Sequence, residues 1–186
     1  IDRLEIATLG NGIDFGNLFT GRYYFSGISN GTRALFGGGL NPGGELFLID
    51  AVTISSDGDA IKFGDLTQAR SQAATACNSV RGIFAAGATG PSGPDTQSTI
   101  DYITMASDGN ASDFGDCVRS VAQRYGGASS ATRGVFAGGS VAPVLQNTIE
   151  YVTIATTGNA IDFGDLSEAS RGNAGVSDSH GGLGGF

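Results

Sequence analysis

The stretch Ile149-Glu-Tyr-Val-Thr-Ile-Ala-Thr-Thr-Gly-Asn-Ala-Ile-Asp-Phe-Gly-Asp165 decides the fold, because versions of it occur four times in the chain of 186 residues. The other copies begin at Ile1, Ile49 and Ile100, so successive copies start 48, 51 and 49 residues apart. Self-similarity at such a period is typical of solenoids, propellers and other repeat arrays. We therefore interpret 1–186 as a single repeat domain. The repeats are 1–48, 49–99, 100–148 and 149–186.

Each copy begins with a run in which apolar and polar residues alternate, as in Ile100-Asp-Tyr-Ile-Thr-Met105. Alternation with period two is the pattern of a β-strand with two different faces. A turn signal such as Ser56-Asp-Gly-Asp59 follows, and a second short run then ends in a Phe-Gly pair. Asp and Gly adopt the backbone conformations that tight hairpins need. The first part of each repeat is therefore predicted to be a β-hairpin.

The second part of each repeat contains two more strand-like segments. One is poor in bulky side chains, as in Ser71–Cys77, and the other has the form Thr132-Arg-Gly-Val-Phe-Ala-Gly-Gly139. Glycines that recur at one register of a strand favour close backbone packing. No Lys-Ser/Thr pair follows them, so a phosphate-binding loop is not indicated. Each repeat is therefore predicted to supply four antiparallel strands.

This arrangement resembles the kelch repeat of β-propellers. The residues that carry the resemblance are the doublet Gly138-Gly139, the strand Ile149-Glu-Tyr151, the aromatic Phe163 and the arginine Arg171. The chain departs from the family in having no tryptophan, and phenylalanine takes that position. The resemblance implies an all-β, kelch-like β-propeller with four antiparallel strands per blade. The Asn-Ala-x-Asp-Phe-Gly-Asp-Leu phrasing is also similar to repeats in virion structural proteins of marine bacteriophages.

In kelch order, the chain starts with the third and fourth strands of a blade and ends with the first and second, at 173–186. Residues 1–17 are thus expected to complete the blade begun by 166–186, which closes a ring of four blades. Closure removes exposed sheet edges, which invite aggregation. The alternative is an arc whose remaining blades come from elsewhere. The chain also opens without an initiator Met, so we expect a processed chain or a segment of a longer one.

Three columns of residues recur at fixed places and are predicted to be structural. The aromatic column is expected to pack between sheets, because each buried aromatic ring removes a large apolar area from water. The acidic column is expected to pair with the arginine column, each exposed pair contributing about 0–1 kcal/mol. A ring of identical ligand contacts is the alternative. The columns are Phe15, Phe63, Phe114 and Phe163; Asp65, Asp116 and Asp165; and Arg33, Arg81 and Arg133.

The segments between the glycine column and the next copy vary most. They span 40–48, 88–99 and 140–148, and they mix proline, glycine and apolar residues. Variable segments of repeat proteins map to loops on one face, often the binding face. These residues either contact a partner or pack over the edges of the blades. The candidate contact residues are Leu46, Phe47, Pro91, Pro94, Val141, Val144 and Leu145.

The charge balance excludes several classes of partner. The net charge is −8 with only 10 Lys and Arg residues, whereas nucleic-acid binding needs clustered cations. The same balance disfavours an anionic membrane surface, and no apolar run approaches the roughly 20 residues of a membrane span. Cys77 and Cys117 lack the close spacing of a metal knuckle, and we interpret them as separate small apolar residues.

No catalytic, cofactor-binding or metal-binding constellation is recognised in the sequence. The acidic turn Asp57-Gly58-Asp59 raises a calcium site as an alternative, but it lacks the EF-hand spacing and terminal glutamate. The single histidine, His180, occupies the arginine column of the last copy. A glycosidase needs two carboxylates in unequal environments. Instead, four acidic residues share one column: Asp2, Asp50, Asp101 and Glu150.

The sequence therefore predicts a non-enzymatic structural or binding module without cofactors. The resemblance to phage repeats implies a place in a virion, such as a tail or appendage, or in an extracellular assembly. The expected partners are other protein subunits, in an oligomer or larger assembly, or a host-surface glycan. Two alternatives remain open, a propeller-type carbohydrate-active enzyme and an intracellular kelch-type adaptor, since a fold does not fix a function.

Overall fold

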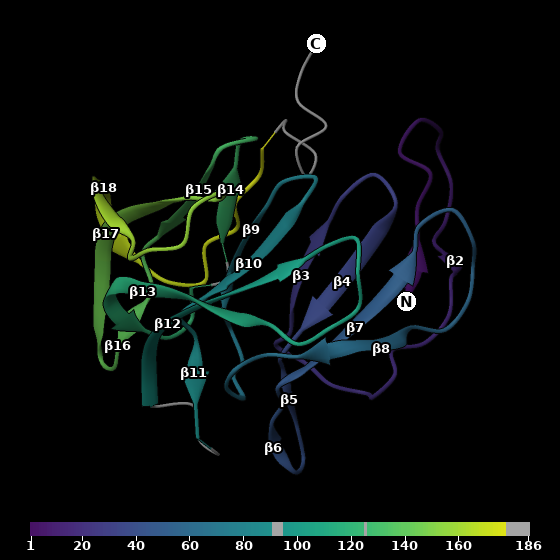
Figure 1. Cartoon of the computed structure of the whole chain (residues 1–186), viewed down its shortest axis with the longest axis horizontal. Helices are drawn as coiled ribbons and strands as arrows, with labels where there is room; N and C mark the ends of the chain where they lie inside the picture. Colours follow the sequence, from purple (N-terminus) through teal and green to yellow (C-terminus); the bar gives the residue numbers. More distant parts are fainter. Residues whose placement is uncertain (91–94, 125, 178–186) are drawn as a thin grey trace.

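The computed structural model describes residues 1–90, 95–124 and 126–177, and all their regular elements are β-strands (Figure 1). Three antiparallel sheets of one plan follow one another along the chain, and we call them sheets I, II and III. Sheet I consists of β3 (Ser26–Ser29), β4 (Arg33–Gly37), β7 (Leu48–Thr53) and β8 (Ile61–Asp65). Sheet II consists of β9 (Ala74–Cys77), β10 (Arg81–Ala85), β12 (Asp95–Thr104) and β13 (Ser112–Val121). Sheet III consists of β14 (Gly127–Ser129), β15 (Arg133–Ala137), β17 (Val144–Thr153) and β18 (Ile161–Ser170).

Six short strands complete the structure. β11 (Ala88–Thr89) pairs with β12 and β16 (Ser140–Val141) pairs with β17, so that sheets II and III each gain a fifth strand. Two more pairs stand apart, namely β1 (Asp2–Arg3) with β2 (Ile13–Asp14) and β5 (Leu40–Asn41) with β6 (Gly44–Glu45). Within the described part of the chain, no helix is long and apolar enough to cross a membrane.

The four-strand unit of each sheet joins the end of one sequence repeat to the start of the next. The predicted all-β class and the antiparallel arrangement are confirmed by the strand pairings. The pairing of the third strand with the fourth shifts register at Ile49/Asp50, Ile100/Asp101 and Ile149/Glu150. Gly115 and Gly164 lie at this irregularity with φ near +144° and +142°. A β-bulge of this kind needs a residue that tolerates positive φ, which explains the glycine of the Phe-Gly pair.

The hydrophobic core lies between successive sheets. Between sheets I and II, Leu35 and Ile49 pack with Phe84 and Met105. A second cluster, which includes Phe114 and buried residues of β15 and β17, joins sheets II and III. A third, smaller cluster joins the segment that follows β2 to sheet I. The clusters between sheets therefore tie each sheet to its neighbour along the chain.

The first strands of the three sheets, β3, β9 and β14, lie beside one another. The Thr75 hydroxyl donates a hydrogen bond to the Gly27 carbonyl at 3.0 Å, and the Cys77 amide donates to the Ser129 hydroxyl at 2.9 Å. A methyl group added at Gly127 would lie 2.0 Å from the Thr75 carbonyl oxygen. The small residues of these strands therefore allow three backbones to approach closely.

The sheets form an open arc. The hairpin β1–β2 lies at one end beside sheet I, and β17 and β18 lie at the other end (Figure 1). Among the described residues, 1–17 form no strand pair with 166–177, and the rest of the expected closing segment, 178–186 with His180, lies outside the described residues. A closed ring is therefore absent from the described part of the structure.

Candidate functional site

Each sheet holds one buried arginine–carboxylate pair on its third strand. The shortest nitrogen–oxygen distance is 2.7 Å between Arg22 and Asp50 and 3.0 Å between Arg70 and Asp101. All six side chains are fully buried. The repeat pattern places the three carboxylates in one column, but it does not identify their arginine partners. The pairs are Arg22–Asp50, Arg70–Asp101 and Arg124–Glu150.

The Arg70–Asp101 pair shows what these groups do. The Asp101 carboxylate also accepts hydrogen bonds from the backbone amide and the hydroxyl of Thr67, at 3.0 and 2.6 Å. The Arg70 guanidinium donates to the Thr99 carbonyl at 2.8 Å. Burial lowers the pKa of Arg70 from its ordinary value, and the charge of Asp101 opposes that shift. The pair thus ties the end of sheet I to sheet II, and the carboxylate is shielded from solvent.

The column of Asp2, Asp50, Asp101 and Glu150 therefore offers no exposed pair of acids for glycoside cleavage. Asp50 accepts from the Phe19 amide as well as from Arg22, and Glu150 accepts from the Val118 amide as well as from Arg124. A retaining or inverting glycosidase needs two carboxyl groups that reach the scissile bond. The remaining member of the column, Asp2, is exposed on β1.

The predicted pairing of the acidic and arginine columns was wrong for Arg33 and Asp65. Arg33 of sheet I pairs instead with Asp108 in the turn that follows β12 of sheet II, and Asp65 pairs with Lys62. The Arg33 guanidinium also lies over the Phe63 ring, 5.0 Å from its centroid. Arg33 therefore reaches the hairpin turn of the following sheet and not the acidic column.

The other two arginines of the column also lie over aromatic rings. Arg81 lies over the Tyr102 ring at 4.7 Å and donates to the Ile154 carbonyl at 3.0 Å. Arg133 lies over the Tyr151 ring at 4.6 Å. The Asp116 side chain accepts a hydrogen bond from Ser98 within its own sheet. Asp165 is exposed on β18.

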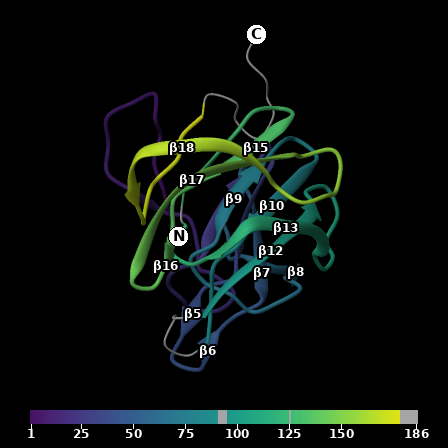
Figure 2. The same cartoon turned by 90° about the vertical axis from the view of Figure 1, so that its left-hand side faces the viewer.

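The aromatic column packs between sheets at three of its four positions. Phe15, Phe63 and Phe114 are buried, whereas Phe163 is 57% exposed. The expectation was therefore wrong for Phe163. The reason is positional, because Phe163 lies on β18 of sheet III, and no described sheet follows sheet III (Figure 2).

A contact between neighbouring repeats recurs three times, and we call it the turn–edge contact. The hairpin turn of one repeat donates backbone hydrogen bonds to the Phe-Gly-Asp/Asn segment of the repeat before it. The Gly58 amide donates to the Phe15 carbonyl at 2.7 Å, and the Ala60 amide donates to the Asn17 carbonyl at 2.8 Å. The side chain of Asp59 accepts from the Asn17 amide at 2.8 Å. The acidic turn considered for calcium therefore joins two repeats.

The other two turn–edge contacts have the same atoms. Their amide-to-phenylalanine distances are 2.9 and 2.7 Å, and their amide-to-aspartate distances are both 2.8 Å. Sequence reasoning missed this contact, although the recurring Asn or Asp after the turn glycine was its signal. The pairs are Gly109–Phe63 with Ala111–Asp65, and Gly158–Phe114 with Ala160–Asp116.

The variable loops place apolar side chains on one rim of the molecule. The hairpins β5–β6 and β16–β17 and the strand β11 all lie toward the lower side in Figure 1. Phe47 is 52% exposed and Val144 is 60% exposed, and Leu46 is partly buried. Val141 and Leu145 are also exposed. The two remaining loop candidates, Pro91 and Pro94, lie outside the described residues.

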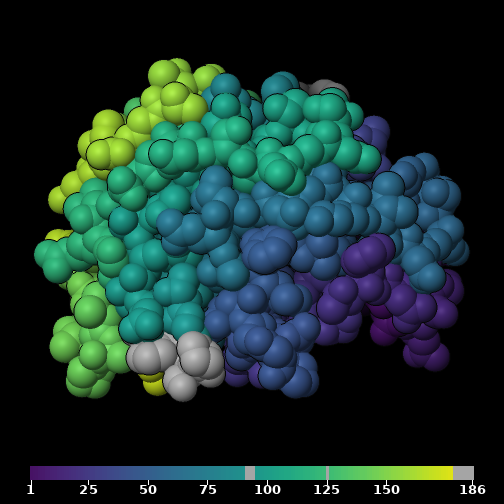
Figure 3. All heavy atoms as spheres, turned by 60° about the horizontal axis from the view of Figure 1, so that its bottom comes forward, coloured from purple at the N-terminus to yellow at the C-terminus, as the bar shows by residue number. Residues whose placement is uncertain are grey.

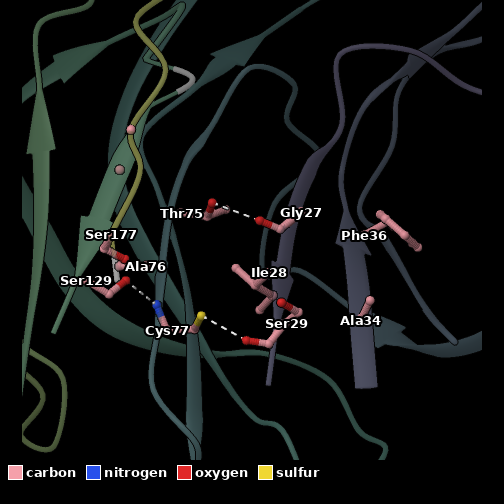
Figure 4. A pocket seen from close by; sticks show the side chains of 12 residues that line it. Gly27, Ile28, Ser29, Ala34, Phe36, Thr75, Ala76, Cys77, Ser129 and Ser177 are labelled. Atoms are coloured by element: carbon pink, nitrogen blue, oxygen red, sulfur yellow. Dashed lines mark hydrogen bonds between the residues drawn. The ribbon is translucent and has the colours of Figure 1, made fainter. Parts of the chain in front are cut away.

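A cavity of about 430 Å³ lies where the first strands of the sheets meet (Figure 4). Its twelve lining residues include no charged side chain. Thr75 and Ser129 are already hydrogen-bonded to neighbouring strands, and the Cys77 thiol donates to the Ser29 carbonyl at 3.3 Å. Burial raises the pKa of Cys77. The polar groups of the lining named here therefore already have partners within the protein.

Both cysteines are free thiols. Burial, and secondarily the charge of Glu150, raises the pKa of Cys117 to about 12. In residues 1–90, 95–124 and 126–177, no three His, Cys, Asp or Glu side chains lie together in a group that could hold a metal ion. No family model matches the sequence, and no curated protein matches it at a significant level.

Proposed function

We propose that this chain is a non-enzymatic structural module that binds neighbouring protein subunits through its variable loops. The observation that carries the proposal is the rim of exposed apolar side chains at the segment after β6 and at β16–β17, represented by Phe47 and Val144. Exposed apolar residues gathered on one side of a soluble domain favour a protein contact. On a repeat scaffold, such loops vary while the sheets that hold them stay constant.

The fold that supports this function is a kelch-like β-propeller with blades of four antiparallel strands. The support is the repeated order of strands in sheets I, II and III and the small residues of β3, β9 and β14 at a common axis. The cores between sheets make each blade depend on its neighbours. A ring of four such blades is one complete form of this fold, and an arc whose remaining blades come from elsewhere is the alternative.

The proposal of a non-enzymatic role rests on how the carboxylates are used. The pair Arg70–Asp101 and its two counterparts hold their acids inside the protein in contact with an arginine. A buried acid paired in this way serves the packing of the sheets. This use favours a scaffold over a carbohydrate-active enzyme.

The location proposed is a virion or another extracellular assembly, and it rests on the resemblance to phage repeats. The proposed partners are protein subunits of that assembly. A host-surface glycan is the alternative ligand for the same rim, and an intracellular adaptor is the alternative setting.

Site-specific crosslinking tests the role of the rim. A photoreactive amino acid replaces Phe47 or Leu145 in the full chain, and the matched control carries it at Ile61, which is equally exposed on β8 outside the rim. Virus particles, culture medium and cells are irradiated separately. An antibody against the protein shows which of these fractions contains it. We expect crosslinks from the two rim positions to a protein subunit in the particle or medium fraction. Crosslinking at the rim no greater than at Ile61 would overturn the proposal, and a product sensitive to glycosidases would identify a glycan instead.

A further inference from the structure

The outer edge of sheet III has the acceptor half of a turn–edge contact, with no described turn bound to it. An added methyl group at Gly64 or Gly115 would meet the backbone of the following turn at 2.0 or 2.6 Å, whereas at Gly164 it would meet nothing within 4 Å. The residue before it, Phe163, is exposed although Phe63 and Phe114 are buried. Figure 2 looks onto this surface, with β17 and β18 at the front. The edge of sheet III therefore has the form of an internal interface that no described residue covers.

The donor half of the same contact lies unbound at the opposite end of the chain. Residues 6–8 form the same turn as the later repeats, with the Thr8 amide donating to the Glu5 carbonyl at 3.4 Å as Ser56 donates to Thr53 at 3.3 Å. Ile6 is 98% exposed.

The counterparts of Ile6 show what this turn does when a full sheet precedes it. Met105 and Ile154, which hold the same position in the third and fourth copies, are fully buried between sheets. Ile54 follows only the two-stranded hairpin β1–β2 and is 45% exposed. The burial of this position therefore depends on a complete neighbouring sheet, which sheet III can supply to Ile6.

The polar residues of the two halves also match. In each internal contact, the backbone amide of the residue after the Phe-Gly pair donates to a side-chain oxygen of the residue after the turn glycine. One of these two residues is Asp and the other is Asn. Where the edge residue is Asn17 the turn residue is Asp59; the other two edges have Asp65 with Asn110 and Asp116 with Asn159. Such a combination avoids two facing carboxylates. The uncovered edge has Asp165 and the unbound turn has Asn11, so this pair follows the same rule.

In sheets I and II, an arginine also has a matching carbonyl acceptor in the turn of the next sheet. Arg33 donates to the Met105 carbonyl at 3.3 Å and Arg81 donates to the Ile154 carbonyl at 3.0 Å. By position, the partner of Arg133 is the carbonyl of Ile6. Among the described residues, the Arg133 guanidinium contacts the Tyr151 ring and makes no hydrogen bond. Arg133 is therefore available for this contact.

We propose that the outer edge of sheet III binds the turn 6–12 of a second copy of this chain, head to tail. The turn of the same chain is held at the far end of the arc, because the hairpin that carries it is bound to sheet I through Phe15 and Asn17. Figure 3 shows the N-terminal residues (purple) and the C-terminal described residues (yellow-green) on opposite sides of the molecule. Association of this heterologous kind builds a ring if the rotation closes and a filament if it does not.

This inference rests on the proposed role as a structural module, but it uses a surface separate from the loop rim. Different substitutions test the loop rim and the head-to-tail contact. Phe163→Ser and Asn11→Asp alter the proposed head-to-tail contact, and Phe47→Ser alters an equally exposed phenylalanine on the rim. If the chain self-associates but its rim positions form no crosslinks, only the proposed function is overturned. If the rim positions form crosslinks but the chain does not self-associate, only this inference is overturned.

The experiment measures the mass of the full chain by analytical ultracentrifugation over a series of concentrations. We expect the unmodified chain and Phe47→Ser to self-associate, and Phe163→Ser and Asn11→Asp to do so at least roughly tenfold more weakly, since like charges facing each other oppose binding. Asn11→Asp combined with Asp165→Asn recreates the Asn17–Asp59 arrangement and is expected to restore association. Circular dichroism confirms that each variant is folded. A chain that stays monomeric at every concentration, or a double variant as weak as Asn11→Asp, would overturn the proposal.

Crosslinking distinguishes the second copy from closure within one chain. In a Cys77→Ala background, chains with Asn11→Cys are mixed with chains with Asp165→Cys and oxidised. A disulfide between the two different chains is expected. If a single chain with both substitutions instead forms the disulfide internally and remains a monomer, the ring closes on itself and the proposal of a second copy is wrong.

Discussion

Arg124 reaches Glu150 from a different place in the sequence than Arg70 reaches Asp101, yet the two buried ion pairs occupy equivalent sites in sheets III and II. Arg70 directly precedes Ser71, the residue that bridges to Ala88, whereas Arg124 follows the corresponding bridging residue, Ala122, by two positions. The acid in sheet III is longer by one methylene group. The site is thus defined by the geometry between the sheets, and the chain fills it in two ways.

Removing one partner of the pair in sheet II is expected to destabilise the protein strongly. Arg70→Ala leaves the fully buried Asp101 without its cation, and such a change costs about 3–5 kcal/mol. The matched control is Lys62→Ala, which breaks the more exposed pair with Asp65 and is expected to cost less than about 1 kcal/mol. Urea unfolding followed by circular dichroism measures both. Equal costs would show that Arg70 and Asp101 are not the tie between sheets that we infer.

Two phenylalanines of one column are expected to differ in their contribution to stability. Phe63→Ala removes a buried ring between sheets I and II and is expected to cost about 3–5 kcal/mol. Phe163→Ala removes an exposed ring from sheet III and is expected to cost less than about 1 kcal/mol in the dilute, unassociated chain. Thermal unfolding at low protein concentration compares them. A large loss at Phe163 under these conditions would mean that its ring is covered within one chain.

A methyl group at the axis is expected to separate the first strands of the sheets. Gly127→Ala places its methyl group 2.0 Å from the Thr75 carbonyl oxygen, so β14 must move away from β9. Overpacking of this kind costs typically about 1–3 kcal/mol. Gly21→Ala is the control, because the space around Gly21 is open. Denaturant midpoints of the two variants should differ clearly, and similar midpoints would argue against close packing at the axis.

The two thiols are expected to react slowly, and Cys117 the more slowly. Because the thiolate is the reactive form, a pKa of about 12 leaves roughly one Cys117 in 10⁴ ionised at pH 8. A thiol reagent should therefore label Cys117 only after unfolding, or as the pH rises toward 12. The same shift implies a contribution to stability that is present below the thiol's unfolded pKa and is lost as the pH rises through its folded pKa. Labelling of folded Cys117 at the rate of a free thiol would contradict its burial.

The sequence determined the repeating unit of this protein. Period-two alternation and the turn residues act within a hairpin, so they predict antiparallel strands without reference to the rest of the chain. The bulge at Gly115 and Gly164 was found only in the structure. Burial at Phe63 and Phe114 followed from the same pattern, because their surroundings repeat.

Only the tertiary structure decided which charged side chains form pairs and which sheet has a face that no neighbouring sheet covers. Arg70 and Asp101 are 31 residues apart, and their contact depends on how a linking segment crosses from one sheet to the next, which no local pattern encodes. The sequence at Phe163 is the same as at Phe114, yet the first ring is exposed and the second is buried. The difference arises because burial belongs to a pair of neighbouring sheets, and a single strand specifies only the face that it offers to the next one.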